Sequence, residues 1–212
     1  LINIDSQQEG FLIVSSAGAN RSTFRLPLKM DTPANGLAAV RVSVIGGKGG
    51  HSGLEINSGR ANAGQQLVRI LLEESKSVPL YLCDVQWGNV DNAIPSEAHA
   101  VVLTGQEYVK ILSDALERWQ NILKYEFGKY EDNLRVTIQD ERPHPESAME
   151  TVMTRKVLSF LLTLPHGVCK MSRDVEGLVE TSSNVAVVKT SPAEVTVNVS
   201  QRSMSDPSLD AI

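Results

Sequence analysis

The most unusual stretch of the sequence is a glycine-rich segment, residues 46–53, which carries a histidine near its end. The four glycines before His51 tolerate positive φ angles and let the backbone approach a ligand closely. A phosphate-binding loop needs Ser or Thr directly after its lysine, but Gly49 follows Lys48. A serine nucleophile elbow needs a glycine two residues after the serine, but Leu54 stands there. Two interpretations remain open: a histidine that faces a ligand, or a flexible turn with an exposed histidine.

Three further polar residues stand where chemistry is common, and each also has a purely structural explanation. Asp5 ends an apolar strand, a position that is typical of a metal ligand or catalytic carboxylate and also of a turn cap. Asn92 lies in an Asn-x-x-Pro sequence, which suits a turn between two strands. Arg202 ends a strand and could be a solvated edge charge. The four histidines show neither H-x-H nor H-E-x-x-H spacing, so no complete metal site can be identified.

Composition narrows the classes of function. The chain has 212 residues, a formal net charge of -5 and 42% hydrophobic residues, enough to bury a core. No basic block stands out, so we expect no nucleic-acid partner. The longest apolar stretch, residues 157–164, is too short to cross a bilayer, so we expect no membrane partner. Cys83 and Cys169 lie far apart, and we expect buried thiols in a reducing, cytoplasmic compartment.

The elements that must position these residues alternate between two periodicities in the first half of the chain. Period-two alternation of valines indicates strands, and apolar residues at helical spacing indicate helices. Thr104 and Glu107 form a Thr-x-x-Glu capping box, which predicts the start of the clearest helix. Its apolar stripe includes Trp119 and Ile122. The predicted elements are strands at 40–45, 80–87 and 98–103 and helices at 57–74 and 104–127.

The same order of elements recurs in the second half. A helix that Ser147 could cap is predicted up to residue 163. The segment 180–184 has the composition of a polar turn. Strand-helix-strand-strand thus occurs near 37–103 and near 134–200, which predicts an α+β fold with a duplicated, ferredoxin-like unit, an antiparallel sheet and helices packed on one face. The predicted strands are 134–138, 167–170, 185–189 and 195–199.

Five segments, taken in order, resemble one family of enzymes. The group is that of two-zinc aminopeptidases and carboxypeptidases, including carboxypeptidase G, and within it the chain is similar to the aminoacyl-histidine dipeptidase (Xaa-His dipeptidase, peptidase D) branch. The resemblance covers nearly the whole chain. The segments are Leu1–Ser6 with Glu9-Gly10, similar to a strand that ends in an aspartate zinc ligand; 49–56, similar to a lid histidine motif; 92–95, similar to a lid asparagine motif; and 180–184 and 201–203, similar to the last two lid signatures.

This resemblance implies a catalytic domain with two bridged zinc ions and a long lid built from two similar halves. Residues 1–33 would then be an end piece of the catalytic domain, and residues 205–212 would return toward it. The two lid halves would be residues 34–133 and 134–204. The implied partners are a dipeptide substrate, the remaining catalytic domain and, in some assemblies, a second copy as a homodimer.

The resemblance also implies a role for each candidate residue. Asp5 would be a ligand of one zinc ion. His51 would reach from the lid to the substrate carbonyl and stabilise the oxyanion. Asn92 would hold the substrate backbone, and Arg202 would bind the terminal carboxylate through its planar guanidinium.

Some features depart from the family pattern or support another function. Gln7 and Gln8 replace two acids that usually follow the ligand aspartate, and residues 15–18 stand where the branch often has a cysteine. The general base and the other zinc ligands would lie outside this chain, so we expect the isolated segment to be inactive. The alternative is a non-enzymatic α+β dimerisation or small-molecule regulatory module. A strand that delivers Asp5 to a metal favours the enzyme.

Overall fold

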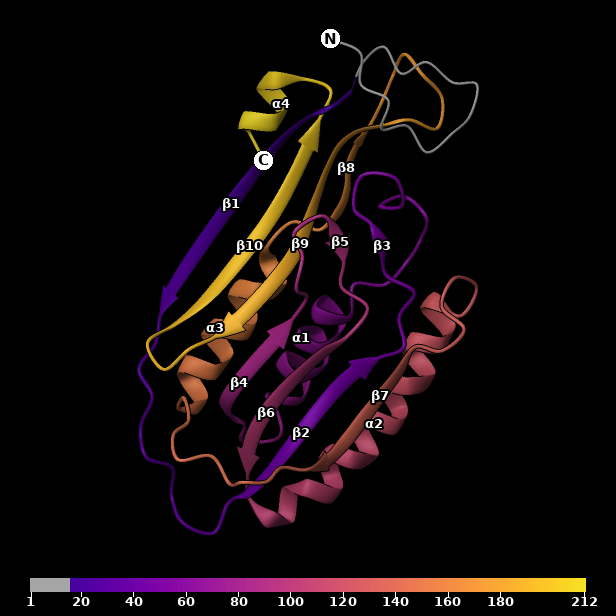
Figure 1. Ribbon diagram of the computed structural model, residues 1–212. Coiled ribbons are helices and arrows are strands. Elements are labelled where there is room, and N and C mark those ends of the chain that lie inside the picture. The colour runs from indigo at the N-terminus through magenta and orange to yellow at the C-terminus, as the bar shows by residue number, and fades with distance from the viewer. Residues whose placement is uncertain (1–15) are drawn as a thin grey trace.

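Strands and helices alternate through residues 16–212, the part of the chain that the computed structural model describes (Figure 1). The strands are β1 (Gly18–Pro27), β2 (Ala38–Ile45), β3 (Gly50–His51), β4 (Tyr81–Trp87), β5 (Ala93–Ile94), β6 (Ala98–Thr104), β7 (Arg135–Asp140), β8 (Gly167–Met171), β9 (Val179–Thr190) and β10 (Glu194–Ser203). The helices are α1 (Ala63–Glu74), α2 (Gln106–Phe127), α3 (Thr151–Thr163) and α4 (Asp206–Asp210).

One large antiparallel sheet organises the fold. Its strands follow the order β1-β10-β9-β4-β6-β2-β7, and β8 pairs with β9 beside this path. β3 and β5 form a separate two-stranded sheet. The helices α1, α2 and α3 cover one face of the large sheet (Figure 1). The predicted α+β fold, with an antiparallel sheet and helices on one face, is therefore confirmed.

Apart from the short strands β3 and β5, the predicted order of strand-helix-strand-strand is found in the first half as β2-α1-β4-β6, whereas the second half runs β7-α3-β8-β9-β10 and has one strand more. The two sets share a single sheet. β7 pairs with β2, so β2-α1-β4-β6-α2-β7 forms a ferredoxin-like unit. β1, from the segment that the resemblance assigned to the catalytic domain, pairs with β10 along its whole length. The predicted domain boundaries stay a prediction.

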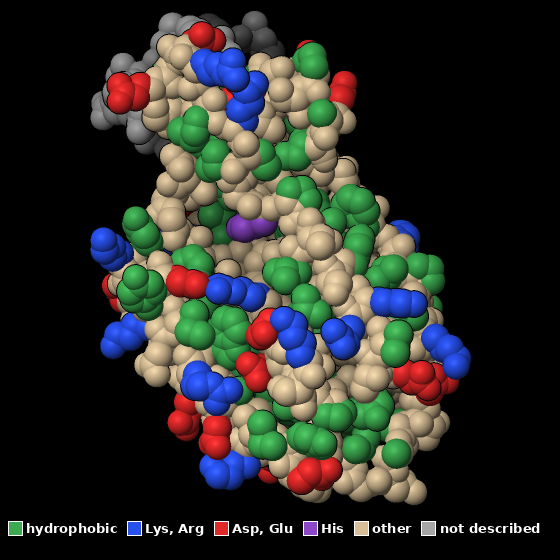
Figure 2. Space-filling model, turned by 180° about the vertical axis from the view of Figure 1, so that it is seen from behind, with side chains coloured by type: hydrophobic (Ala, Val, Ile, Leu, Met, Phe, Trp, Pro, Cys, Tyr) green, Lys and Arg blue, Asp and Glu red, His purple; other side chains and the backbone are tan. Residues whose placement is uncertain are grey.

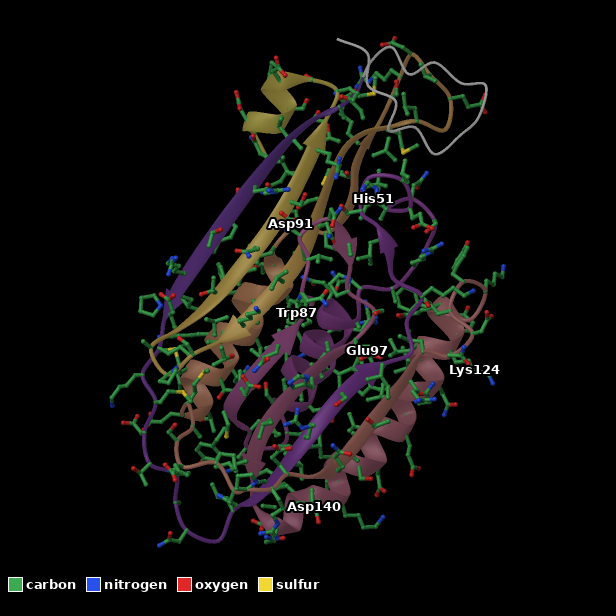
Figure 3. The ribbon with its side chains drawn as sticks, viewed as in Figure 1. His51, Trp87, Asp91, Glu97, Lys124 and Asp140 are labelled. Carbon is green, nitrogen blue, oxygen red and sulfur yellow. The ribbon has the colours of Figure 1, made fainter. Side chains whose placement is uncertain are left out.

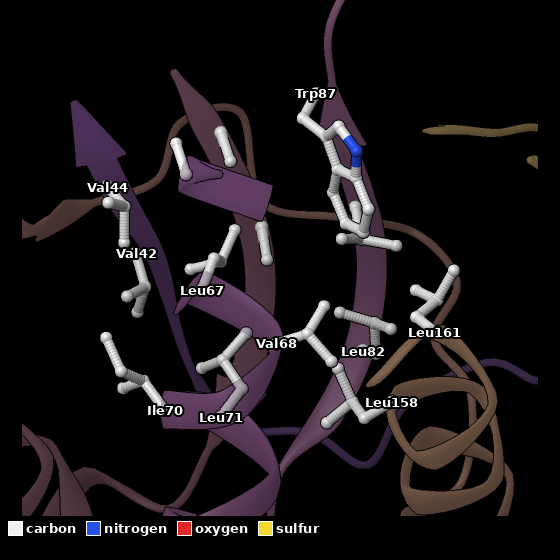
Figure 4. Close-up of a cluster of buried hydrophobic side chains, with 14 of the residues drawn as sticks. Val42, Val44, Leu67, Val68, Ile70, Leu71, Leu82, Trp87, Leu158 and Leu161 are labelled. Atoms are coloured by element: carbon white, nitrogen blue, oxygen red, sulfur yellow. The ribbon is translucent and has the colours of Figure 1, made fainter. Parts of the chain in front are cut away.

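The hydrophobic core lies between the sheet and the helices (Figure 4). Alternate residues of each strand face the helices, because successive side chains point to opposite faces of a sheet. Helical spacing brings the apolar residues of α1 onto the side that meets both the sheet and α3. Complete burial of one such side chain contributes roughly 1.5–3 kcal/mol. Fully buried members include Val42, Val44, Leu67, Leu71, Leu82, Leu158 and Leu161.

The two halves of the sheet meet at β4 and β9. Only one residue pair joins these strands in regular register, Trp87 with Val188, among the residues that the structure describes. The Thr190 hydroxyl accepts a hydrogen bond from the Val85 N–H and donates one to the Val85 carbonyl, both at 3.0 Å. The Trp87 indole donates to the Val185 carbonyl at 3.2 Å. Side chains therefore replace part of the backbone ladder at this junction.

Two predicted helix starts were wrong. α1 begins at residue 63 rather than near 57, because the Asn62 side chain accepts a hydrogen bond from the Gln65 N–H at 3.1 Å and caps the helix there. The Thr104–Glu107 capping box does not form. Thr104 is the last residue of β6, and its hydroxyl donates to the Pro79 carbonyl at 2.8 Å.

Tertiary contacts also overrode local signals in the second half. Ser147 does not cap α3, because Ala148 pairs with Asp31 and the Met149 N–H donates to Leu82, which delays the helix until residue 151. The segment 180–184 is not a turn. It lies inside β9, and residues 181–184 are buried.

The surface mixes charge and hydrophobicity. On the helix side, Lys and Arg alternate with Asp, Glu and hydrophobic side chains (Figure 2). Ile122, expected on the buried stripe of α2, is exposed.

Cys83 is a buried free thiol, as predicted, and burial raises its pKa to about 12. Cys169 is exposed on the short strand β8, so its predicted burial was wrong. No helix in residues 16–212 is long and apolar enough to span a membrane.

Candidate functional site

The glycine-rich segment forms a loop between the end of β2 and the start of α1. His51 lies in the upper part of the molecule as drawn in Figure 3, far from Asp140 near the bottom. β3 and β5 hold this loop in place through the pairs Gly50 with Ile94 and His51 with Ala93. The Ser52 N–H donates to the Asn92 carbonyl at 2.8 Å. The loop is therefore fixed against the segment that carries Asn92, and His51 is half-buried rather than fully exposed.

The hydrogen bonds of the His51 ring define which nitrogen is free. Its Nδ1 accepts from the backbone N–H groups of Gly53 and Leu54, each at 3.2 Å. A ring nitrogen that accepts two hydrogen bonds carries no hydrogen, so the neutral imidazole has its hydrogen on Nε2. His51 can therefore offer an Nε2–H donor to a group outside the loop.

Arg202 lies beside His51, although 150 positions separate them in the sequence. A Cβ built on Gly53 would stand 3.1 Å from Arg202 Nε and 3.1 Å from His51 Cε1, so both side chains contact this glycine. Arg202 belongs to β10, between Ala19 of β1 and Ser182 of β9. It is half-buried, and within the described residues its Nε has no hydrogen-bond partner. A buried, unpaired guanidinium nitrogen is costly unless a ligand satisfies it.

Asn92 is exposed in the turn before β5, as its Asn-x-x-Pro sequence predicted. It lines a cavity of about 430 Å³ together with Lys189 and Asn198. Behind this turn, the Asn184 side chain donates to the Ala93 carbonyl at 2.8 Å and so ties β9 to β5. The turn is thus held at a fixed distance from the sheet.

Three further buried polar atoms, one on the His51 loop and two on β9, have no hydrogen-bond partner among the described residues. Ser52 Oγ, Ser183 Oγ and Asn184 Oδ1 are buried and make no hydrogen bond to any described residue. All three residues are at most 2% exposed. Buried polar atoms in folded proteins are usually hydrogen bonded, so these oxygens mark a polar interior beside β9.

The remaining histidines do not join this site. His166 is packed against Asn62 at the start of α1, and burial lowers its pKa to about 4. His99 lies near Asp84 and lines a cavity with Ala93 and Ile94 of β5, and burial together with the nearby Arg41 lowers its pKa. His144 hydrogen bonds to the Leu37 carbonyl.

The described residues offer no metal centre. Between residues 16 and 212, no group of three or more His, Cys, Asp or Glu side chains could hold a metal ion. Asp5, the predicted zinc ligand, lies outside the described residues. The roles predicted for Asp5, His51, Asn92 and Arg202 stay predictions, although the structure does bring the last three to one end of the sheet.

Sequence reasoning missed the residues that shape the loop. Glu55 and Arg60 form an ion pair beneath it, and the buried Glu131 accepts hydrogen bonds from two of its backbone N–H groups. Glu55 stands four residues after His51, a spacing that suits a side chain returning to the backbone of a turn. Glu131 left no comparable signal, because it follows α2 and reaches the loop only through the fold.

Two dipeptidases are similar to the chain over essentially its whole length. Cytosol non-specific dipeptidase of Escherichia coli (strain K12) is 34% identical over 212 residues, which are 100% of this chain and 44% of that protein. The crystal structure of aminoacylhistidine dipeptidase from Vibrio alginolyticus matches with a TM-score of 0.91 and 31% identity, over 98% of this chain and 42% of that one. A scan of protein-family profiles gives no match. The chain thus spans less than half the length of these relatives, and the predicted resemblance to the aminoacyl-histidine dipeptidases is confirmed.

Proposed function

Starting from this resemblance to the aminoacyl-histidine dipeptidases, we propose that the chain is the lid and substrate-binding segment of a metal-dependent dipeptidase. Its substrates would be dipeptides of the Xaa-His type. The remaining catalytic domain of the same protein would be its partner, and the cytosol would be its compartment. The isolated segment would be inactive, because the described residues contain no metal centre.

The observation that supports this proposal is the meeting of His51 and Arg202 at Gly53. One side chain offers a neutral Nε2–H donor, and the other offers a guanidinium with a buried, unpaired Nε. A dipeptide presents two groups that need such donors: the scissile carbonyl, which becomes an oxyanion, and the terminal carboxylate. An N–H donor and a cation side by side match both groups.

Each residue then has a distinct task. His51 donates from Nε2 to the oxyanion as negative charge develops on the carbonyl oxygen. Arg202 binds the terminal carboxylate and sets the length of substrate that fits. Asn92, in the neighbouring turn, holds the substrate backbone. Zinc ions bound by the remaining protein, with Asp5 as the one ligand expected from this chain, would polarise the carbonyl and lower the pKa of a bound water.

Substitution of His51 in the full-length dipeptidase tests the proposal. His51→Ala should lower kcat by roughly 100- to 1,000-fold, because an oxyanion donor acts mainly in the transition state. KM should change much less, and metal content and circular dichroism should stay as in the wild type. His144→Ala, at the other end of the sheet, is the matched control and should retain activity. A near-normal kcat for His51→Ala would remove the proposed role.

A further inference from the structure

Two carboxylates hold the loop that carries His51. Glu131, only 4% exposed, closes the base of the loop by accepting from the N–H groups of Lys48 at 2.8 Å and Ala61 at 2.9 Å. Glu55 acts at the tip, where its Oε2 accepts from the His51 N–H at 2.8 Å. Carboxylate oxygens therefore hold the loop backbone both at its base and at its tip.

Arg60 connects Glu55 to the other side of the tip. One of its terminal nitrogens pairs with Glu55 Oε1, and the other donates to the Gly49 carbonyl. The backbone is thus gripped both before and after Gly50. We call this pair the Glu55–Arg60 clamp.

Gly50 shows how closely the clamp contacts the backbone. Its φ is +136°, a conformation that residues with a side chain rarely adopt. A Cβ at this position would collide with the Glu55 carboxylate and the Arg60 guanidinium. The clamp occupies the space that the missing side chain leaves, so glycine is required here by both conformation and contact.

The clamp and the imidazole are parts of one turn. The Glu55 N–H donates to the His51 carbonyl at 2.9 Å, while the Glu55 side chain accepts from the His51 N–H. Between these two bonds lie Gly53 and Leu54, whose N–H groups bind His51 Nδ1. If Glu55 were removed, the turn would lose a bond at its first residue, and the two N–H groups would lose their fixed direction toward Nδ1.

The ion pair contributes little to overall stability. The side chains of Arg60 and Glu55 are 24% and 34% exposed, and water screens the attraction of ion pairs that are partly exposed. The geometry instead ties the clamp to the orientation of one imidazole. Misplacement of a reacting group by about 1 Å can cost on the order of 100-fold in rate.

We propose that Glu55 and Arg60 are positioning residues that hold His51 in the orientation and Nε2–H tautomer needed for donation to the substrate. The catalytic part of this inference rests on the proposed function, because it requires that His51 donates during catalysis. The tautomer itself can be measured without turnover.

The kinetic experiment uses the full-length dipeptidase with Glu55→Ala, His51→Ala and both changes together. Glu55→Ala should lower kcat by roughly 10- to 100-fold and change KM by no more than about twofold. In the His51→Ala background the same change should alter kcat by no more than about twofold, because residues that act through one another are not additive. Glu73→Ala removes an exposed Glu–Lys pair on α1 and is the matched control with wild-type kinetics expected.

A nitrogen NMR spectrum of the His51 ring in the same protein gives the second readout. The wild type should show one tautomer with the hydrogen on Nε2, and Glu55→Ala and Arg60→Ala should show a mixture. The catalytic role of the clamp would be overturned, while the proposed function stands, by either of two results. One is a normal kcat for Glu55→Ala, and the other is that Glu55→Ala lowers kcat as much in the His51→Ala background as in the wild type. Normal kcat for His51→Ala would overturn the proposed function and the catalytic role of the clamp. An unchanged single tautomer in both clamp variants would overturn the positioning role itself.

Discussion

His166, which follows α3 and packs against Asn62 at the start of α1, should make the stability of the chain depend on pH. The Asn62 side-chain nitrogen lies 3.3 Å from His166 Nδ1 and also donates to the Val185 carbonyl at 3.1 Å. An amide nitrogen is a donor only, so Nδ1 must accept and stay unprotonated. His166 as a whole is only half-covered, but Nδ1 faces the buried Asn62, and this side governs its ionisation. Burial lowers the pKa of His166 from 6.5 to about 4.

The direction and size of the effect follow from that pKa. Between pH 6.5 and 4 the unfolded chain binds the proton and the folded chain does not, so stability is fully present above pH 6.5 and decreases as the pH falls toward 4. At about 1.4 kcal/mol per pH unit, the complete loss is about 3 kcal/mol, and most of it is reached at about pH 4.5.

Urea unfolding of the 212-residue chain at about pH 7 and 4.5 measures this loss, and His166→Asn supplies the comparison. Asn cannot ionise, so the free energy of unfolding of the variant should depend less on pH, by about 2–3 kcal/mol across this interval. Carboxylates contribute equally to both proteins and cancel in the difference. Equal losses of unfolding free energy in the two proteins, or an NMR titration midpoint of His166 near 6.5, would exclude this role of His166.

Two further predictions concern substrate and metal in the full-length dipeptidase. Arg202→Ala should weaken binding of dipeptides by about 1.5–3 kcal/mol, the range for hydrogen bonds to charged groups, and much less for C-terminally amidated substrates; equal losses in KM for acid and amide would exclude a carboxylate role. Asp5→Ala should lower both activity and zinc content measured by mass spectrometry, and full metal occupancy with full activity would leave Asp5 as a turn cap.

Hydrophobic periodicity predicted well the strands and helices that bury a single face. The alternating valines of β2 and β10 and the apolar stripe of α2 lie in their predicted elements. Each of these elements has one hydrophobic face, and that face packs into the core between the sheet and the helices. Helix starts were less predictable. The Thr104 hydroxyl could cap a helix or bond a strand neighbour, and the Pro79 carbonyl, brought close by the fold, decided between them.

The candidate site was predictable as a set of residue types, not as an arrangement. His51 and Asn92 could be singled out from their local sequences. Their position near Arg202 depends on the pairing of β10 with β9 and on the packing of Gly53 against the Arg202 side chain, and no local sequence pattern contains either contact. The polar side chains of the segment 180–184 favoured a turn. Residues 181–184 are instead buried inside β9, where polar side chains can hydrogen bond to buried neighbours.

The pairing of β1 with β10 has a consequence for biosynthesis. Thr23 and its partner Asn198 are 175 positions apart, and ribosomes add roughly 5–20 residues per second. β1 therefore emerges on the order of 10–40 s before its partner exists. During that interval it is an unpaired edge that could join another nascent chain. Arg21 and Arg25 place positive charge on this edge, which disfavours pairing with other chains, and in the folded chain the same arginines form ion pairs with Asp91 and Glu194.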